Sequence, residues 1–337
     1  MTLRTQHGTA RQGLRSRVAA SLATLALAAL SLTGAASTAP AAATEPLAAT
    51  TRAPVDLPGV NGLSRTAQER AVAGYWTPER TAEALRNGTR DDGAGTRDDG
   101  TRTAARAAAT ADARALDAGP GLDPVGKILF NYAGGSPGSC SGTVVNTPAE
   151  TLVITAGHCL YSDDGWHKNI AFVPAYDGTE PLGVFTAWNI AVDPKWSTEE
   201  DERYDYGVVI THDNAAGETA ADAAGAFDVA IDRGTVNPVT IVGYPAVDGY
   251  DGRHQEFCES ISEPSLPPRD VITADCSNMR QGASGGPWLI DYDPAEEIGD
   301  IYGVNGQANE VLVTTCKFTQ RTLDFVVLMD QLAAARP

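Results

Sequence analysis

Short runs of apolar or alternating residues recur from about residue 121 to residue 315, and clusters of Gly, Pro, Asn and Asp separate them. This spacing is typical of strands that end in tight turns. Many short strands in succession indicate an all-β barrel or sandwich. The expected strands lie at 127–131, 140–146, 152–156, 170–174, 183–190 and 206–211, and then at 227–231, 239–243, 256–260, 271–275, 286–290, 301–304 and 311–315.

The pattern changes near the end of the chain. Phe325, Leu328, Met329 and Leu332 follow the i, i+3, i+4, i+7 spacing of one helix face. We therefore expect a C-terminal helix at about 321–335, with these side chains packed on the body of the protein. Its role would be structural.

The first 43 residues have the pattern of a secretory signal. Four arginines precede an apolar run at 19–32, which is too short and too rich in Ala for a stable membrane span. Small-residue cleavage sites follow at 36–43, and the absence of an adjacent Arg pair favours the general secretory route. We predict a signal peptide at 1–43 and a secreted, extracellular protein; a retained N-terminal anchor is the alternative.

Residues 44–118 are of low complexity and are rich in Ala, Thr, Arg and Pro. Gly-Thr-Arg-Asp-Asp-Gly occurs twice, at 88–93 and 95–100. This composition predicts a disordered or loosely helical linker, with one short helix at about 78–86. In an exported protein we interpret the segment as a pro-region; a plain spacer is the alternative.

Composition and charge limit the possible partners. The chain has 337 residues, of which 42% are hydrophobic, so it can bury a sizeable core. Its net charge is −18, which repels nucleic acid and anionic membranes. We expect no nucleic acid partner, and no membrane association after the signal is removed.

Three segments carry candidate chemistry. Ser284 lies in Gly-Ala-Ser-Gly-Gly-Pro, His158 ends a strand-like run that begins at Thr151, and Asp205 precedes the run Gly207–Ile210. Glycines around a serine leave its hydroxyl uncovered and leave backbone N–H groups free to bind an oxyanion. A serine becomes a nucleophile when a His takes its proton and a carboxylate orients that His. A Gly-rich turn and a turn-capping Asp are the structural alternatives.

The order of these residues separates two families of hydrolases. The sequence around Ser284 also fits the G-x-S-x-G elbow of α/β-hydrolases, in which the His follows the serine. All five histidines precede Ser284, which excludes that family: His7, His158, His167, His212 and His254. The order His, Asp, Ser is that of the chymotrypsin fold.

The segments ITAGHC, YDYGVV and GASGGP resemble the three signature segments of the chymotrypsin/trypsin superfamily of serine endopeptidases. They are most similar to its secreted bacterial branch, near the glutamyl-endopeptidase-like group. The resemblance covers about residues 120–337 and implies a peptidase domain at 119–337. That domain would contain two antiparallel six-stranded β-barrels, at about 120–215 and 225–318, with the active site between them.

The resemblance also implies the roles of the site residues. His158 would be the general base, Asp205 would orient it, and Ser284 would form an acyl-enzyme with a peptide substrate. The backbone N–H groups of Gly282 and Ser284 would bind the oxyanion. We expect a monomer that needs no cofactor. Asp193 and Asp201 are alternative carboxylates, and a catalytically silent trypsin-fold binding or adhesion module is the alternative function.

Substrate binding would involve residues on both sides of Ser284. Asn278 would form the floor of the specificity pocket, and Gly303, Val304 and Asn305 would pair with the substrate backbone. A neutral Asn278 does not support a preference for Arg or Lys, and the absence of a His at 303–306 does not support a preference for Glu. Ala283 stands where many animal members have an acidic residue, so activation of a zymogen by that ion pair is not available.

Five cysteines in an exported protein predict disulfides and one free thiol. A Cys140–Cys159 bridge would match the family's bridge beside the catalytic His. Cys258 and Cys276, which flank a Pro-rich loop, form the second expected pair and leave Cys316 free; a Cys276–Cys316 bridge is the alternative. No Cys-x-x-Cys or His-rich spacing indicates a metal site. Acidic loops at 163–164 and 199–202 could hold calcium weakly, although solvated loops are the simpler interpretation.

Overall fold

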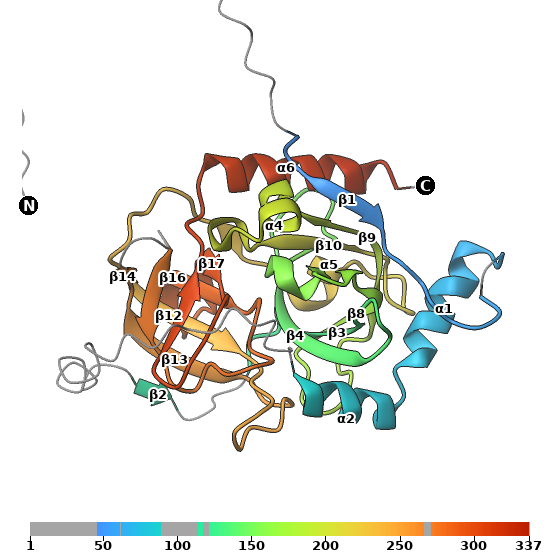
Figure 1. The fold of residues 1–337 in the computed structure, drawn as a ribbon, viewed down its shortest axis with the longest axis horizontal. Helices are drawn as coiled ribbons and strands as arrows, with labels where there is room; N and C mark the ends of the chain where they lie inside the picture. Colours follow the sequence, from blue (N-terminus) through green and yellow to red (C-terminus); the bar gives the residue numbers. More distant parts are fainter. Residues whose placement is uncertain (1–45, 61, 89–113, 117–120, 266–270, 337) are drawn as a thin grey trace, which may run out of the picture. The chain divides into compact units, whose positions relative to one another are not determined.

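The computed structural model describes residues 46–60, 62–88, 114–116, 121–265 and 271–336 (Figure 1). The predicted signal peptide at 1–43 and all of the two repeats except Gly88 lie outside the described residues. The described residues all belong to one folded unit.

The first barrel is a closed antiparallel sheet. Its six strands follow the order β9-β10-β5-β4-β3-β8, and β8 pairs back onto β9. Every residue of β3, β5 and β10 is buried, because both faces of these strands are covered. The prediction of a six-stranded first barrel is confirmed. The strands are β3 (Val125–Asn131), β4 (Pro137–Val144), β5 (Leu152–Thr155), β8 (Lys168–Pro174), β9 (Phe185–Val192) and β10 (Gly207–Thr211).

Short helices, 3₁₀ turns and a hairpin lie in the connections that leave the strands of this barrel. A 3₁₀ turn, η1 (Gly157–Cys159), follows β5, and a second one, η2 (Glu202–Tyr204), precedes β10. Helix α4 (Pro194–Glu199) lies between β9 and η2, and the hairpin β6 (Tyr161–Ser162) and β7 (Gly165–Trp166) follows η1. Helix α5 (Ala220–Ala224) leads to the second barrel.

The second barrel divides its strands between two sheets. One has the order β11-β17-β16-β12-β13-β2, and the other has the order β14-β15-β18. A disulfide between Cys258 on β13 and Cys276 after β15 joins the sheets, as does a bond from Val304 N on β17 to Thr315 Oγ1 on β18. The strands are β2 (Arg114–Leu116), β11 (Asp228–Val229), β12 (Pro238–Gly243), β13 (Glu256–Ile261), β14 (Glu263–Pro264), β15 (Ile272–Asp275), β16 (Pro287–Asp293), β17 (Ile298–Val304) and β18 (Leu312–Thr315).

Residues 46–88 fold onto the first barrel, whereas their composition predicts a disordered or loosely helical linker. Strand β1 (Ala49–Arg52) pairs with β9, and helices α1 (Arg65–Tyr75) and α2 (Pro78–Asn87) follow (Figure 1). The expected helix at 78–86 is confirmed: Thr77 caps its N-terminus, and Gly88 ends it at φ +53°. Burial of Trp76 and Leu85 against the barrel supplies the apolar contacts that a linker would lack.

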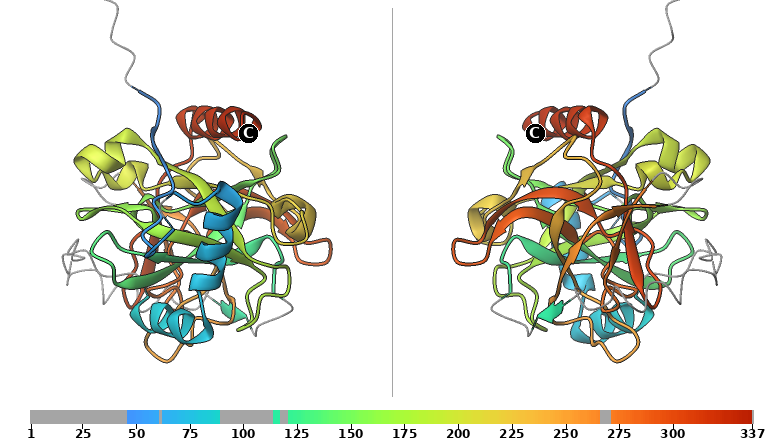
Figure 2. Two further views of the ribbon diagram at one scale, coloured as in Figure 1. Left: turned by 90° about the vertical axis from the view of Figure 1, so that its right-hand side faces the viewer. Right: turned by 90° about the vertical axis from the view of Figure 1, so that its left-hand side faces the viewer.

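Helix α6 (Gln320–Ala334) confirms the predicted C-terminal helix. Its buried face contains Phe325, Val326 and Met329, whereas Leu328 is exposed, so the expected packing of Leu328 is wrong. Both views in Figure 2 place α6 and α2 at opposite ends of the folded unit. Among the described residues, no helix is both long enough and apolar enough to cross a membrane.

Candidate active site

His158 and Asp205 are brought together by two paired strands. β5 ends at Thr155, opposite Gly207 at the start of β10, so the turns that carry the two side chains are neighbours. Asp205 Oδ2 lies 2.8 Å from His158 Nδ1, and Asp205 Oδ1 accepts a hydrogen bond from His158 N at 2.9 Å. Both residues are more than nine-tenths buried. The carboxylate therefore fixes a proton on Nδ1 and leaves Nε2 as the basic nitrogen.

The two alternative carboxylates have other partners. Asp193 is fully buried, caps α4 through Lys195 N and accepts two hydrogen bonds from Arg321. Asp201 caps η2 and pairs with Arg203. Asp205 is accordingly the carboxylate that the fold directs to His158.

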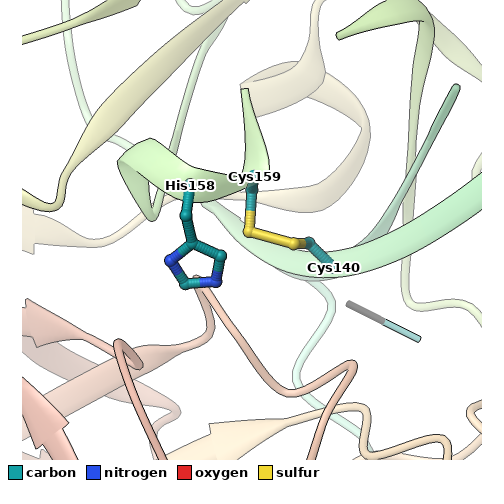
Figure 3. Close-up of side chains that lie close together, drawn as sticks. All are labelled: Cys140, His158 and Cys159. Carbon is teal, nitrogen blue, oxygen red and sulfur yellow. A yellow bond between two sulfur atoms is a disulfide. The ribbon is translucent and has the colours of Figure 1, made fainter. Parts of the chain in front are cut away.

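The turn that carries His158 is packed from two sides. A Cβ added at Gly157 would lie 2.7 Å from Trp196 Cδ1, so only glycine fits beneath this ring. The Trp196 ring lies 6.2 Å from the imidazole of His158. On the other side a disulfide joins Cys159 to Cys140 on β4, as Figure 3 shows. The predicted bridges Cys140–Cys159 and Cys258–Cys276 are both confirmed, and Cys316 is free and buried.

Ser284 lies in a turn between β15 and β16 that only glycine can form at several positions. Gly282 has φ +94° and Gly285 has φ +80°, a region that strains residues with a side chain. A Cβ at Gly285 would collide with Thr155 Oγ1, and a Cβ at Gly286 would collide with Val242 O. The glycines thus let this turn approach the backbone of both barrels.

Side chains from both barrels hold the turn in place. Ser141 on β4 donates from its backbone N to Ser284 O and from its Oγ to Gly282 O, at 2.7 and 2.9 Å. Asn305 donates from Nδ2 to Ala283 O, at 2.9 Å, and to Val242 O, and its Oδ1 accepts from Trp288. Sequence reasoning missed the role of Ser141, because a lone serine within a strand carries no signal of a contact 141 residues further along the chain.

His158 and Ser284 both line one cavity of about 110 Å³. Trp196 borders it on the side of the first barrel, and Met279 and Val313 border it on the side of the second. The structure therefore brings the predicted base and the predicted nucleophile to the same space.

The predicted substrate-binding residues divide into two groups. Asn305 lines the cavity, whereas Gly303 and Val304 lie in β17 outside the cavity lining. Asn278 is buried and donates to Phe257 O, and Met279 lines the cavity in its place. That Asn278 forms the floor of a specificity pocket stays a prediction.

No family model matches the chain. The protease Anisep from Arthrobacter nicotinovorans has a similar solved structure, with a TM-score of 0.58 and 26% identity over 65% of this chain and 99% of that one. The thermostable serine protease AL20 from an extremophilic microorganism also has a TM-score of 0.58, with 22% identity over 64% of this chain and 99% of that one. The chain belongs to the chymotrypsin/trypsin-like serine protease superfamily.

Membership of this superfamily accounts for the two barrels and for the way in which each contributes one wall of the cavity. The sequence-based recognition of the superfamily and the all-β fold class are thus confirmed. The chain also resembles a curated relative, an extracellular metalloprotease from Bacillus subtilis (strain 168), with 36% identity over 72 residues. That match spans 21% of this chain and about a fifth of the relative, 22% of its length.

That relative is named a metalloprotease, so the capacity of the residues around His158 to bind a metal is relevant here. Cys140, His158 and Cys159 place potential ligand atoms within 4.8 Å of one another, and no other group of three such residues is this close in the described part of the chain. Both sulfurs are joined in a disulfide (Figure 3), and His158 Nδ1 is hydrogen-bonded to Asp205 Oδ2. Cysteine binds a metal as a thiolate, and the disulfide removes both thiolates, so this cluster does not fit a metal.

Proposed function

We propose that the chain is a secreted serine endopeptidase that hydrolyses peptide bonds through Ser284, His158 and Asp205. The hydrogen bond between His158 Nδ1 and Asp205 carries the proposal, because it prepares a base at the edge of the cavity that Ser284 lines. The similarity of the chain to serine proteases supports hydrolysis of peptide bonds as its reaction.

His158 would act through Nε2. It would take the Ser284 proton as the oxygen attacks the scissile carbonyl, and it would then donate that proton to the leaving amine. Water would then attack the carbonyl of the acyl-enzyme while His158 takes a proton from it, and His158 would return that proton to Ser284 as the ester bond breaks. Asp205 would hold the imidazole ring in one tautomer and stabilise its charged form, and its second oxygen is already fixed by His158 N.

The oxyanion would bind to the backbone N–H groups of Gly282 and Ser284. The positive φ of Gly282 supports this role, because a left-handed residue next to right-handed ones lets neighbouring backbone N–H groups converge on one anion. Loss of one such donor typically lowers kcat by about 10²- to 10³-fold.

Export and processing form part of the same proposal. Two disulfides are typical of a protein that folds outside the cytoplasm. Residues 1–43 would be removed as a signal peptide, residues 44–118 would be a pro-region, and the peptidase domain would begin near residue 119. The substrate would be a protein or peptide, and the enzyme would act as a monomer.

Labelling of the intact chain with a fluorophosphonate probe tests the proposal. We expect the wild type to be labelled and to hydrolyse casein, and we expect Ser284→Ala to lose both properties. Ser260→Ala, on β13, is the control and should retain both. A wild-type protein that is folded by circular dichroism but neither labelled nor active would instead be a catalytically silent binding module.

A further inference from the structure

Residues 46–88, called the strap from here on, end beside the loop that leads to Gly282. None of them lines the catalytic cavity. A Cβ added at Gly88 would lie 3.3 Å from Gln281 Cβ and 3.6 Å from Gln281 O, so the end of α2 touches the residue just before Gly282. Gly88 O also accepts a hydrogen bond from Ser139 N, at 3.1 Å, which ties this contact to β4.

A second path of contacts runs from α2 to the same loop. Leu85 is 4% exposed, and a Cβ at Gly252 would lie 3.2 Å from its Cδ2 and 2.9 Å from Ala246 Cβ. Ala246 N in turn donates to Gln281 O at 2.8 Å. A Cβ at Gly282 would lie 2.9 Å from Ala246 Cβ, so the packing between α2 and Gly282 is continuous.

The rest of the strap is attached to the first barrel at separate points. β1 adds to the edge of β9, and Trp76 Nε1 donates to Asn169 O at 2.8 Å. Asn87 Nδ2 donates to Pro137 O, also at 2.8 Å. The end of α2 is therefore a fixed point, and Figure 1 shows this helix lying against β4.

We propose that the strap is an activating element: Leu85 and Gly88 hold the 280–282 loop in the conformation in which Gly282 N–H faces the oxyanion. The inference rests on the proposed function, because it assigns a role to the same turn. It makes Leu85 and Gly88 positioning residues. It also means that this part of the proposed pro-region assists catalysis rather than inhibiting it, and that it would have to stay bound to the first barrel after any cleavage near residue 119.

Two matched pairs of variants in the full chain test this role. Gly88→Ala is compared with Gly59→Ala, because Gly59 has φ +78° with no atom within 4 Å of an added Cβ. Both changes strain the backbone, but only the first presses on Gln281. Leu85→Ala is compared with Leu63→Ala, whose side chain is 45% exposed.

We expect Gly88→Ala and Leu85→Ala to lower kcat on a peptide substrate about tenfold, with KM changed less than about twofold, because a displaced oxyanion donor acts on the transition state. The pH at which kcat/KM is half-maximal should not move, since His158 and Asp205 are untouched. The two control variants should stay within about twofold of the wild type in kcat. Leu85→Met should restore most of the activity lost in Leu85→Ala.

Hydrogen exchange at residues 279–284 gives a readout that needs no activity. In a Ser284→Ala background, Gly88→Ala should exchange faster at these amides than Gly59→Ala, at a temperature at which both variants are folded. Equal exchange and equal kcat within each pair would overturn the activating role. If the wild type is not labelled by the fluorophosphonate probe, the catalytic proposal fails, and the exchange result alone decides whether the strap positions the turn.

Discussion

In the first barrel, His158 and Asp205 follow two paired strands, whereas in the second barrel Ser284 lies in a loop between strands of different sheets. Backbone hydrogen bonds close the first barrel into a ring. The second barrel joins its two sheets through a disulfide and a side-chain bond to Thr315. The turn with Ser284 then depends on Ser141 and Asn305 for its position.

This difference shows which interactions position the residues in each half of the candidate site. The register of β5 and β10 brings the turns of His158 and Asp205 together, and register is set by the residues of the strands themselves. Ser284 depends on side chains that reach its turn from distant strands. The first half should therefore tolerate the loss of single side-chain bonds, and the second half should not.

The largest expected effect is that of Asn305→Ala. Asn305 is 1% exposed and bonds to Val242 O, Ala283 O and Trp288 Nε1, so the change leaves three buried polar groups without that partner. We expect a loss of about 4 kcal/mol in the free energy of unfolding, with reduced kcat. Urea denaturation measures the loss. The exposed Asn146→Ala is the control, and an equal loss in both variants would contradict the comparison.

Arg321→Met tests the first barrel. Arg321 binds the fully buried Asp193 with two hydrogen bonds, and removing it leaves that carboxylate short of a partner. We expect about 3 kcal/mol lower stability, but kcat within about threefold of the wild type, because strand register still holds Asp205. The more exposed Arg203→Met should cost less than about 1 kcal/mol. A loss of kcat as large as that of Asn305→Ala would remove the distinction between the barrels.

Lys127 tests the contact between the barrels. It is fully buried in β3 and donates from Nζ to Tyr244 O, beyond β12, at 3.0 Å. Burial lowers the pKa of Lys127 from 10.5 to about 7, because the ammonium loses its hydration. Between these two values the unfolded chain binds a proton that the folded chain lacks, so this residue's contribution to stability rises with pH.

For Lys127→Met we therefore expect a flatter dependence of stability on pH than in the wild type. The difference should amount to at most about 1.4 kcal/mol for each pH unit. Urea denaturation of both proteins at pH 7, 8 and 9 measures it. Parallel curves for the two proteins would mean that Lys127 is not desolvated between the barrels.

The smallest expected difference concerns the two disulfides. They close loops of almost equal length, with sequence separations of 19 for Cys140–Cys159 and 18 for Cys258–Cys276. Loop closure alone predicts about 3 kcal/mol for each. We expect the double Ala variant of Cys258 and Cys276 to lose about 1 kcal/mol more than that of Cys140 and Cys159, because its bridge joins separate sheets. Thermal unfolding compares the two, and equal losses would show that both barrels are closed equally well.

Much of the fold could be predicted from the sequence because its signals are local. Alternation of apolar residues marks the strands, and the glycines around Ser284 mark a turn that no other residue forms. The helix at 320–334 follows from a short pattern of the same kind, whereas the Cys140–Cys159 bridge is expected from the resemblance to the superfamily, and the Cys258–Cys276 bridge is one of two pairings that the sequence leaves open.

The remainder depends on contacts between distant residues. Trp76 packs into the core of the first barrel, and its indole N–H donates to Asn169 O, 93 residues away, so a segment of low apolar content folds although its composition predicts a linker. Asn278 lies outside the cavity lining because its buried amide donates to Phe257 O, whereas the next residue, Met279, lines the cavity. A shift of one residue reverses which side chain faces the cavity, and turn residues carry no periodicity that would fix it.

The free thiol of Cys316 can report local opening of the protein interior beside Asp205. Its sulfur lies 3.9 Å from Asp205 O, and burial raises the pKa of this thiol well above its ordinary value. A thiol-reactive dye will therefore be silent toward the native protein and will report each event that uncovers this part of the interior. The rate of colour development then reports how readily the interior beside Asp205 opens, and no cysteine has to be introduced for the measurement.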